Sequence, residues 1–394
     1  MSSGLQPMIP YGRQDISEAD IQAVVDVLRS DWLTQGPAVP RFEQAVAAYA
    51  GAKDAVAVNS ATAALHIACL ALGVGPGDTV WTSPNTFVAS ANCALYCGAS
   101  VDFVDIDAQT FNMSIGCLEQ KLKSAAGSGK LPKVVIPVHF AGQPCDMPAV
   151  HRLRHKYGFQ VIEDASHAIG ASGWNSCVGS GLYSDITVFS FHPVKIITTG
   201  EGGMALANDA NLAERMRQFR THGITNRREL MQSRPVDEIW NYQQIELGYN
   251  YRMTDFQAAL GLSQLRRLDQ FVNRRHEIAK MYDHELRSLP VISQMQLPQI
   301  RSSYHLYPIR IRESLCGRSQ RQVFDFLKAA DIAVNLHYIP VYRQPYYQAL
   351  GFSGGYCPEA ELYHRECISL PMYSGLSDVQ VQYVLTALKK ALAV

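Results

Sequence analysis

The chain has 394 residues, of which 47% are apolar and 18% are charged, and its 35 basic and 35 acidic side chains cancel. This apolar fraction excludes an intrinsically disordered chain, the length allows two domains, and the charge balance argues against a partner held through nucleic-acid phosphates. No apolar run is long enough for a membrane span and the N-terminus does not resemble a signal peptide, so we expect a cytoplasmic protein without a membrane or nucleic-acid partner.

The nine cysteines are scattered along the chain, and none are spaced as Cys-x-x-Cys. An odd, scattered set of this kind predicts neither a disulfide framework nor a zinc site. We therefore expect reduced thiols and no bound metal.

Short β-rich runs alternate with helical patterns through the first two-thirds of the chain. Helices are predicted over 17–29, 41–49, 62–73, 86–97, 114–123, 146–157 and 209–220, and strands over 55–60, 79–84, 100–106, 133–140, 159–166, 185–191 and 202–209. This alternation is typical of an α/β domain with a largely parallel sheet. The polar stretch 223–246 has little periodicity and is predicted to be a long loop, which in compact proteins often has a function.

The remaining third predicts a smaller α+β domain. The pattern from 254 to 289 is strongly helical and long enough to connect two domains. Strands are predicted at 305–311 and 332–339, and helices at 319–330, 358–367 and 377–391. We therefore predict a large α/β domain over 1–265 and a small C-terminal domain over 266–394.

Lys195 lies between two branched apolar residues in the string ITVFSFHPVKIITTGEGG, after a predicted strand and before a glycine-rich turn. Burial there would lower the pKa of the amine, and a neutral lysine amine can form a Schiff base with a carbonyl compound. Taken alone, a surface lysine that buries only its aliphatic stem explains the same pattern.

Asp164 lies near the end of the predicted buried strand 159–166. Ligand sites of open α/β sheets lie at the carboxyl ends of strands, so the carboxylate is expected to face a crevice, where it could keep a heterocyclic nitrogen protonated. Taken alone, an aspartate that caps a helix is an equally good interpretation.

Two further features follow predicted strands. In the string NSATAALHIA, the N–H groups of Ala61 and Thr62 and the Thr62 hydroxyl predict an anion site at a helix N-terminus, to which Ser190 could add a hydroxyl. Small polar residues also cap helices that bind nothing. The ring of Phe87 could stack on a flat cofactor, or pack in the core.

In combination these features predict a cofactor. A phosphate site, a stacking ring, an acid for a ring nitrogen and a Schiff-base lysine occur in this chain order, each near the end of a strand. Together they match pyridoxal 5′-phosphate (PLP). A nicotinamide-dependent dehydrogenase is disfavoured, because the glycine string GVGPGD follows a helix and precedes a strand, the reverse of the required order.

Over nearly its whole length the sequence resembles the DegT/DnrJ/EryC1/StrS family of sugar aminotransferases. The resemblance is carried by the strings IPYGRQDI, SDWLTQGP, NSATAAL, TSPNTFVASAN, VIEDASHAIG, FSFHPVKIITTGEGG, GYNYRMTDFQAALGLSQL, NLHYIPVYRQPYY and SLPMY. It implies fold type I of the PLP-dependent transferases, as in aspartate aminotransferase, with a large mixed, mostly parallel sheet domain and a smaller α+β C-terminal domain.

The resemblance also implies roles for individual residues. Lys195 corresponds to the lysine that binds the cofactor, Asp164 to the partner of the pyridine nitrogen, and His167 to the neighbour of the 3-oxygen. The remaining implied cofactor contacts are Ala61, Thr62 and Ser190 for the phosphate, Phe87 for stacking, and Asn250 from the neighbouring subunit of a homodimer with shared active sites. The implied lining of the sugar-nucleotide pocket is Tyr11, Asp31, Trp32, Leu33, Thr34, His337, Tyr338, Ile339 and Pro340. Several family members have Trp or Tyr in place of Phe87, and others have Gln in place of His167.

Within the family, the best match is the branch of pseudaminic acid synthesis. The implied reaction moves the amino group of L-glutamate, through pyridoxamine phosphate, to C4 of a UDP-linked 4-keto-6-deoxy-N-acetylhexosamine, with ping-pong kinetics. The sequence leaves open an aminotransferase that acts at C3 or on a dTDP-linked sugar, and a protein that binds PLP without turnover. A deoxysugar 3-dehydratase is disfavoured, because that branch carries histidine in place of Lys195.

Overall fold

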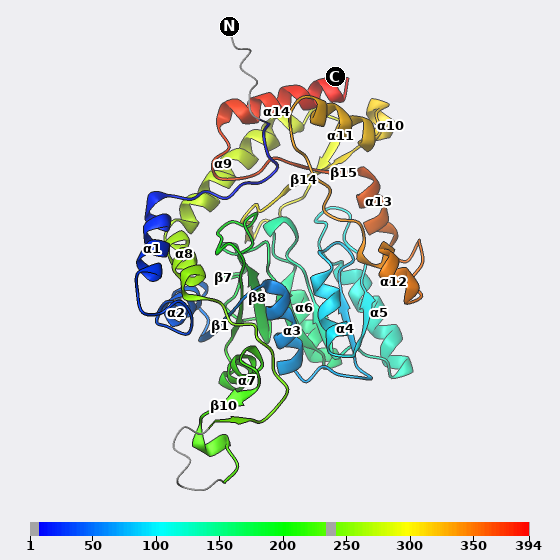
Figure 1. Ribbon diagram of the computed structural model, residues 1–394. Helices are drawn as coiled ribbons and strands as arrows, with labels where there is room; N and C mark the ends of the chain where they lie inside the picture. Colours follow the sequence, from blue (N-terminus) through cyan, green and yellow to red (C-terminus); the bar gives the residue numbers. More distant parts are fainter. Residues whose placement is uncertain (1–7, 234–241, 394) are drawn as a thin grey trace.

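The computed structural model describes residues 8–233 and 242–393. A seven-stranded sheet in the order β1-β9-β8-β5-β4-β2-β3 forms its centre (Figure 1). The strands are β1 (Asp54–Val58), β2 (Thr79–Thr82), β3 (Ser100–Phe103), β4 (Val134–Ile136), β5 (Gln160–Asp164), β8 (Ile186–Ser190) and β9 (Gly203–Ala207). β9 is antiparallel to both of its neighbours, whereas the other pairs are parallel. The sheet is therefore mixed and mostly parallel, as predicted.

Helices cover both faces of this sheet (Figure 1). They are α1 (Glu18–Leu28), α2 (Ala38–Ala50), α3 (Ala61–Ala71), α4 (Ala89–Tyr96), α5 (Ile115–Ser128), α6 (Met147–Tyr157), α7 (Ala210–Arg220) and α8 (Asp255–Leu265). Successive side chains of a strand point to opposite faces, and both faces are apolar here. In β5, for example, Val161 belongs to the core under α5 and α6, and Ile162 to the core under α3 and α4.

A second sheet, antiparallel and in the order β12-β14-β15, is formed by the C-terminal part of the chain. Its strands are β12 (Val291–Ser293), β14 (Tyr307–Ile311) and β15 (Cys367–Leu370), and the helices here are α9 (Leu268–Leu286), α10 (Glu313–Cys316), α11 (Gln320–Ala329), α12 (Pro345–Ala349), α13 (Pro358–Glu366) and α14 (Asp378–Ala391). Its core also includes Ile9, which forms a β-bridge with Ile332. The α+β character agrees with the sequence, and the domain division at residue 265 stays a prediction.

The long helix predicted over 254–289 is wrong in one respect, because the structure breaks it into α8 and α9 at Arg266 and Arg267. Contacts with the N-terminal segment explain the break. The Arg267 guanidinium donates hydrogen bonds to the carboxylates of Asp15 and Asp20, and Gln264 donates to Asp20 at 2.7 Å. These tertiary contacts override a local pattern that favours one continuous helix.

Two other local predictions need correction or refinement. Residues 332–339 do not form a strand; the segment forms only isolated bridges at Ile332 and Asn335. The loop predicted over 223–246 contains the strand pair β10 (Ile224–Thr225) and β11 (Gln243–Gln244) and the 3-10 turn η2 (Arg228–Leu230), and 234–241 lie outside the described residues. This hairpin projects from the body of the molecule below α7 (Figure 1).

The cysteines are free thiols, and Cys69, Cys93, Cys145, Cys357 and Cys367 are buried, in line with the sequence. In the ranges 8–233 and 242–393, no helix combines the length and apolar character needed to cross a bilayer.

Candidate active site

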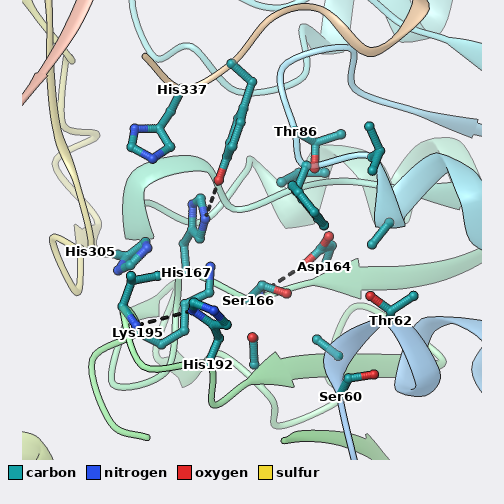
Figure 2. A pocket seen from close by; sticks show the side chains of 18 of the residues that line it. Ser60, Thr62, Thr86, Asp164, Ser166, His167, His192, Lys195, His305 and His337 are labelled. Atoms are coloured by element: carbon teal, nitrogen blue, oxygen red, sulfur yellow. Dashed lines mark hydrogen bonds between the residues drawn. The ribbon is translucent and has the colours of Figure 1, made fainter. Parts of the chain in front are cut away.

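A cavity of about 650 Å³ lies at the carboxyl ends of the central strands. Figure 2 shows side chains from several separate segments pointing into it. The predicted site residues that line it are Tyr11, Ala61, Thr62, Phe87, Asp164, His167, Ser190, Lys195, His337, Tyr338 and Ile339. Residues that are far apart in the sequence are therefore brought together at the edge of the sheet where α/β proteins bind ligands.

Asp164 is the last residue of β5, and its carboxylate is fixed on both oxygens. Ser90 of α4 donates a hydrogen bond to Oδ2 at 2.5 Å, and the N–H of Ser166 donates to Oδ1 at 3.0 Å. The side chain is only 5% exposed. A buried acid held in one orientation is suited to an interaction with a cationic N–H group of a ligand.

The preceding residue, Glu163, does not line this cavity. Its carboxylate accepts hydrogen bonds from the Ser184 and Thr187 hydroxyls and pairs with Nε2 of His139 at 2.6 Å. These partners keep the pKa of Glu163 below its usual value although burial alone would raise it. β5 therefore carries two adjacent buried carboxylates with different surroundings, and one of them lines the cavity.

Lys195 lies in the connection between β8 and β9. Burial lowers the pKa of its amine to about 8, although the nearby Asp164 carboxylate favours the charged form. The connection is closed at its base, where the N–H of Phe191 donates to the carbonyl of Gly202 and the N–H of Thr199 donates to that of Phe191. Lys195 is thus presented to the cavity by a short loop fixed on two paired strands.

The N-terminus of α3 forms one end of the cavity. Ser60 caps the helix by accepting a hydrogen bond from the N–H of Ala63 at 3.1 Å, and the first helical residues, Ala61 and Thr62, line the cavity. Gly203 of β9 packs directly against this turn, where a Cβ atom would lie 2.4 Å from the Ala61 nitrogen. Free N–H groups at the start of a helix favour an anion, and here a cavity lies in front of them.

His167 and Tyr338 form an aromatic part of the wall. The N–H of Ala141 donates to Nδ1 of His167 at 3.3 Å, and Nε2 lies 3.1 Å from the Tyr338 hydroxyl (Figure 2). Burial, with the charge of Lys195, keeps the pKa of His167 well below its usual value. The ring is therefore neutral, and since Nδ1 accepts a hydrogen bond, the proton is on Nε2. Phe87 lines the same cavity but is 60% exposed in the single chain.

Some predicted site residues do not line the cavity of the single chain. Asp31, Trp32, Leu33 and Thr34 follow α1 and are exposed, and Asn250 is exposed on the segment after β11. Pro340 is buried beside the cavity-lining Ile339 but is not itself part of the wall. The roles implied for these residues stay predictions.

Other residues that line the cavity were missed by the sequence-based reasoning. They are Ser60, Leu65, Thr86, Val88, Ala89, Val138, Ser166, His192, Val194, Glu201, Gly202, His305, Asn335, Leu336 and Gln344. Ser60, Thr86 and His192 lie next to predicted site residues or within the sequence motifs that resemble the family. Their position in the sequence could therefore have identified them. His305 had none, because it belongs to a segment that the sequence places in another domain. In the described ranges, no three His, Cys, Asp or Glu residues form a set of metal ligands.

Comparison with known proteins assigns the family. The family model described as "DegT/DnrJ/EryC1/StrS aminotransferase family" matches residues 14–389. The chain is a member of this aminotransferase family. Lys195 and Asp164, in one cavity, are thus found in a protein whose family transfers amino groups.

Two relatives of this family member illustrate its range. It is 39% identical over 384 residues to the spore coat polysaccharide biosynthesis protein SpsC of Bacillus subtilis, covering 97% of this chain and 96% of the relative. It is 37% identical over 380 residues to the UDP-4-amino-4,6-dideoxy-N-acetyl-beta-L-altrosamine transaminase of Campylobacter jejuni, covering 96% of both chains.

Solved structures confirm the fold of this aminotransferase. Helicobacter pylori PseC, described as an aminotransferase of pseudoaminic acid biosynthesis, superimposes with a TM-score of 0.89 at 30% identity, covering 98% of this chain and 99% of PseC. The putative sugar aminotransferase Spr1654 from Streptococcus pneumoniae gives a TM-score of 0.87 in its PLP form at 31% identity, covering 98% and 99% of the two chains, and is also known in a PMP form. The fold is therefore that of the PLP-dependent sugar aminotransferases.

Proposed function

We propose that this chain transfers the amino group of L-glutamate to C4 of a UDP-linked 4-keto-6-deoxy-N-acetylhexosamine, a step of pseudaminic acid synthesis, with PLP as cofactor. The observation that carries the proposal is the presence of Lys195 and Asp164 in one cavity with the N-terminus of α3. The names of the C. jejuni relative and of PseC support the substrate, and the PLP and PMP forms of Spr1654 support the cofactor.

The side chains present fit PLP. The turn at Ser60, Ala61 and Thr62 is suited to a phosphate, and the absence of a side chain at Gly203 keeps that turn against the sheet. Asp164 would pair with the pyridine nitrogen, and Lys195 would attach to the aldehyde carbon.

When bound, PLP supplies an electron-accepting ring that stabilises negative charge on the carbon that loses its proton. The chain's own residues do the rest. Asp164 would hold a proton on the ring nitrogen. Because burial lowers its pKa to about 8, part of the Lys195 amine is neutral near physiological pH. This neutral Nζ would take the proton from the α-carbon of the donor and, in the second half-reaction, would move a proton in the opposite direction toward the keto sugar. Neutral His167 holds its Nε2 proton toward Tyr338 and orients this wall.

We further propose that the active unit is a homodimer with shared sites. Trp32 is 56% exposed and Leu33 is 48% exposed, although both are large apolar side chains in a segment that resembles the substrate-lining part of the family. Asn250 is exposed as well. A second copy of the chain that covers these residues would bring them to the partner's cavity.

Absorption spectroscopy tests the proposed reaction. The purified protein with PLP is expected to show the visible band of the lysine-bound cofactor, and L-glutamate is expected to replace it with a near-ultraviolet band. Lys195→Ala should lose the band and turnover altogether, because no other residue is proposed to bind the aldehyde. Retention of both by Lys195→Ala would refute the assignment.

A second candidate is amino transfer to a different keto nucleotide sugar. The higher identity to SpsC, a protein of spore coat polysaccharide synthesis, favours this alternative. Once glutamate has removed the visible band, UDP-linked and dTDP-linked 3-keto and 4-keto sugars can be compared for their ability to restore it. Restoration by the UDP-linked 4-keto-6-deoxy-N-acetylhexosamine at the highest kcat/KM supports the first proposal.

A further inference from the structure

His305 is a buried polar residue of the cavity to which no role has been given above. It lies just before β14, lines the cavity and is 4% exposed. Its ring is 4.4 Å from that of His167, centroid to centroid, and Figure 2 shows the two side by side on the Lys195 side of the cavity. Nδ1 is fully buried and has no hydrogen-bond partner among the residues that the structure describes.

Two neighbouring polar side chains of this wall already have protein partners. The Tyr338 hydroxyl is paired with His167, and Nδ1 of His337 lies 2.8 Å from the hydroxyl of Ser369. A buried polar group that lacks a partner costs free energy, and such groups in native proteins usually have a specific reason. Nε2 of His305 also lacks a hydrogen-bond partner in the described ranges, but unlike Nδ1 it is not fully buried, so it is the ring nitrogen that a polar ligand in the cavity could reach.

The backbone of His305 is held by an unusual residue. Arg275 of α9 is 2% exposed, and its Nη1 donates hydrogen bonds to the carbonyls of Tyr304, His305 and Met372 at 3.0, 3.1 and 3.0 Å. The N–H of Met372 in turn donates to the carbonyl of Tyr11, another residue of the cavity wall. One buried guanidinium thus fixes two wall segments, which is a positioning role.

On the basis of the proposed function, we propose that His305 is a substrate-binding residue of both half-reactions, and that Arg275 positions it. Two substrates that react in turn on one cofactor must place their reacting carbons at the same point beside Lys195. The groups attached next to the reacting carbon are the α-carboxylate of the amino acid and a ring substituent of the sugar. These two groups then contact the same part of the cavity wall. An imidazole can donate to a carboxylate and can donate to or accept from a hydroxyl or amide, whereas an arginine can only donate.

Equilibrium binding of substrates that do not react tests the inference. The probes are 2-oxoglutarate and UDP-N-acetylglucosamine, each added to the PLP form, with which neither can exchange an amino group, and both are followed by calorimetry. His305→Leu is expected to raise both dissociation constants about tenfold, the effect of one lost hydrogen bond to a ligand. His305→Gln, which keeps a donor and an acceptor, should change them less than His305→Leu, and PLP affinity should stay at the wild-type value in both variants.

His364 offers a matched control, because its Nδ1 is also buried without a partner but the residue does not line the cavity. His364→Leu should bind both probes as the wild type does. Arg275→Met should weaken both probes without abolishing PLP binding, which gives a second measurement if His305→Leu folds poorly.

The inference is overturned if His305→Leu and Arg275→Met bind both probes within twofold of the wild type, or if only one probe is affected. The inference is also overturned if the wild-type protein binds neither probe, because the protein then does not bind the two substrate classes that His305 is proposed to contact. The proposed function fails separately, when the wild-type holoenzyme shows no spectral response to L-glutamate.

Discussion

Burial sets the protonation states in the cavity. Burial lowers the pKa of His337 to about 3, and it keeps the pKa values of His167 and His305 well below their usual range, with the charge of Lys195 as a further cause. These rings are therefore neutral at physiological pH. Lys195, with a pKa of about 8, is the group of this set that titrates near the working range.

The pH dependence of PLP uptake follows from that value. Only the neutral amine of the cofactor-free protein can attack the aldehyde, and the neutral fraction rises as the pH rises through the pKa. The second-order rate constant for PLP binding should therefore increase about fivefold between pH 7 and pH 8 and level off above about pH 9. Stopped-flow absorbance between pH 7 and 10 measures this directly. A rate that keeps rising steeply up to pH 10 would mean that Lys195 has the pKa of an exposed lysine.

At the scale of elements, the site depends on how closely β9 approaches α3. Gly203 is paired with Val58 of β1 on one side and with Ser190 of β8 on the other, and its missing side chain leaves room for the first turn of α3. This contact places two cavity-lining features, the helix N-terminus and Ser190, at adjacent positions. The glycine is needed for its small size, because its φ is not in the left-handed region.

Gly203→Ala tests this packing. The new Cβ would lie 2.4 Å from the Ala61 nitrogen, so α3 has to move, and we expect PLP affinity to fall at least tenfold and stability to drop by about 1–3 kcal/mol. PLP titration and thermal unfolding measure the two effects. Gly127→Ala, where nothing lies within 4 Å of the added Cβ, is the matched control and should keep wild-type PLP affinity. Unchanged PLP affinity in Gly203→Ala would mean that the turn is not part of the phosphate site.

At the scale of the whole molecule, the cavity of a single chain lacks several of the residues that the family resemblance assigns to the active site. Residues 31–34 and Asn250 are exposed and lie outside its cavity, and Phe87 on the cavity wall is largely exposed as well. In the proposed homodimer, the twofold axis would bring the same surface of each subunit to its partner, so both sites would be completed at once.

Mixed dimers test this arrangement. Lys195→Ala and Asn250→Ala are each expected to have low activity, but if Asn250 acts in the partner's site, a mixed dimer contains one site with both native residues. Random reassociation of equal amounts should then restore about a quarter of wild-type activity. Activity that stays at the average of the two separate variants would contradict a shared site, whereas gel filtration alone would not decide this.

The sequence predicted most of the central sheet, and residues that it singled out, such as Lys195, Asp164 and His167, line one cavity, because alternating apolar runs and strand-end motifs are local signals. It could not predict features that depend on distant contacts. The break between α8 and α9 is caused by Asp15 and Asp20, more than 240 positions away in the chain. The segment 332–339 is apolar enough for a strand, yet part of it is used as cavity wall. His305 carries no motif, and only the fold brings it next to His167.

The register of β5 decides which of the two carboxylates at its end lines the cavity. Glu163 is buried with His139, Ser184 and Thr187, while the neighbouring Asp164 lines the cavity. A slip of one residue in the pairing of β5 with β4 and β8 would exchange the faces of these two side chains. The slip would remove the Asp164 carboxylate from the cavity. At the same time it would separate the Glu163 carboxylate from its three partners. During refolding, recovery of PLP binding by this protein would therefore report on the register of its central strand.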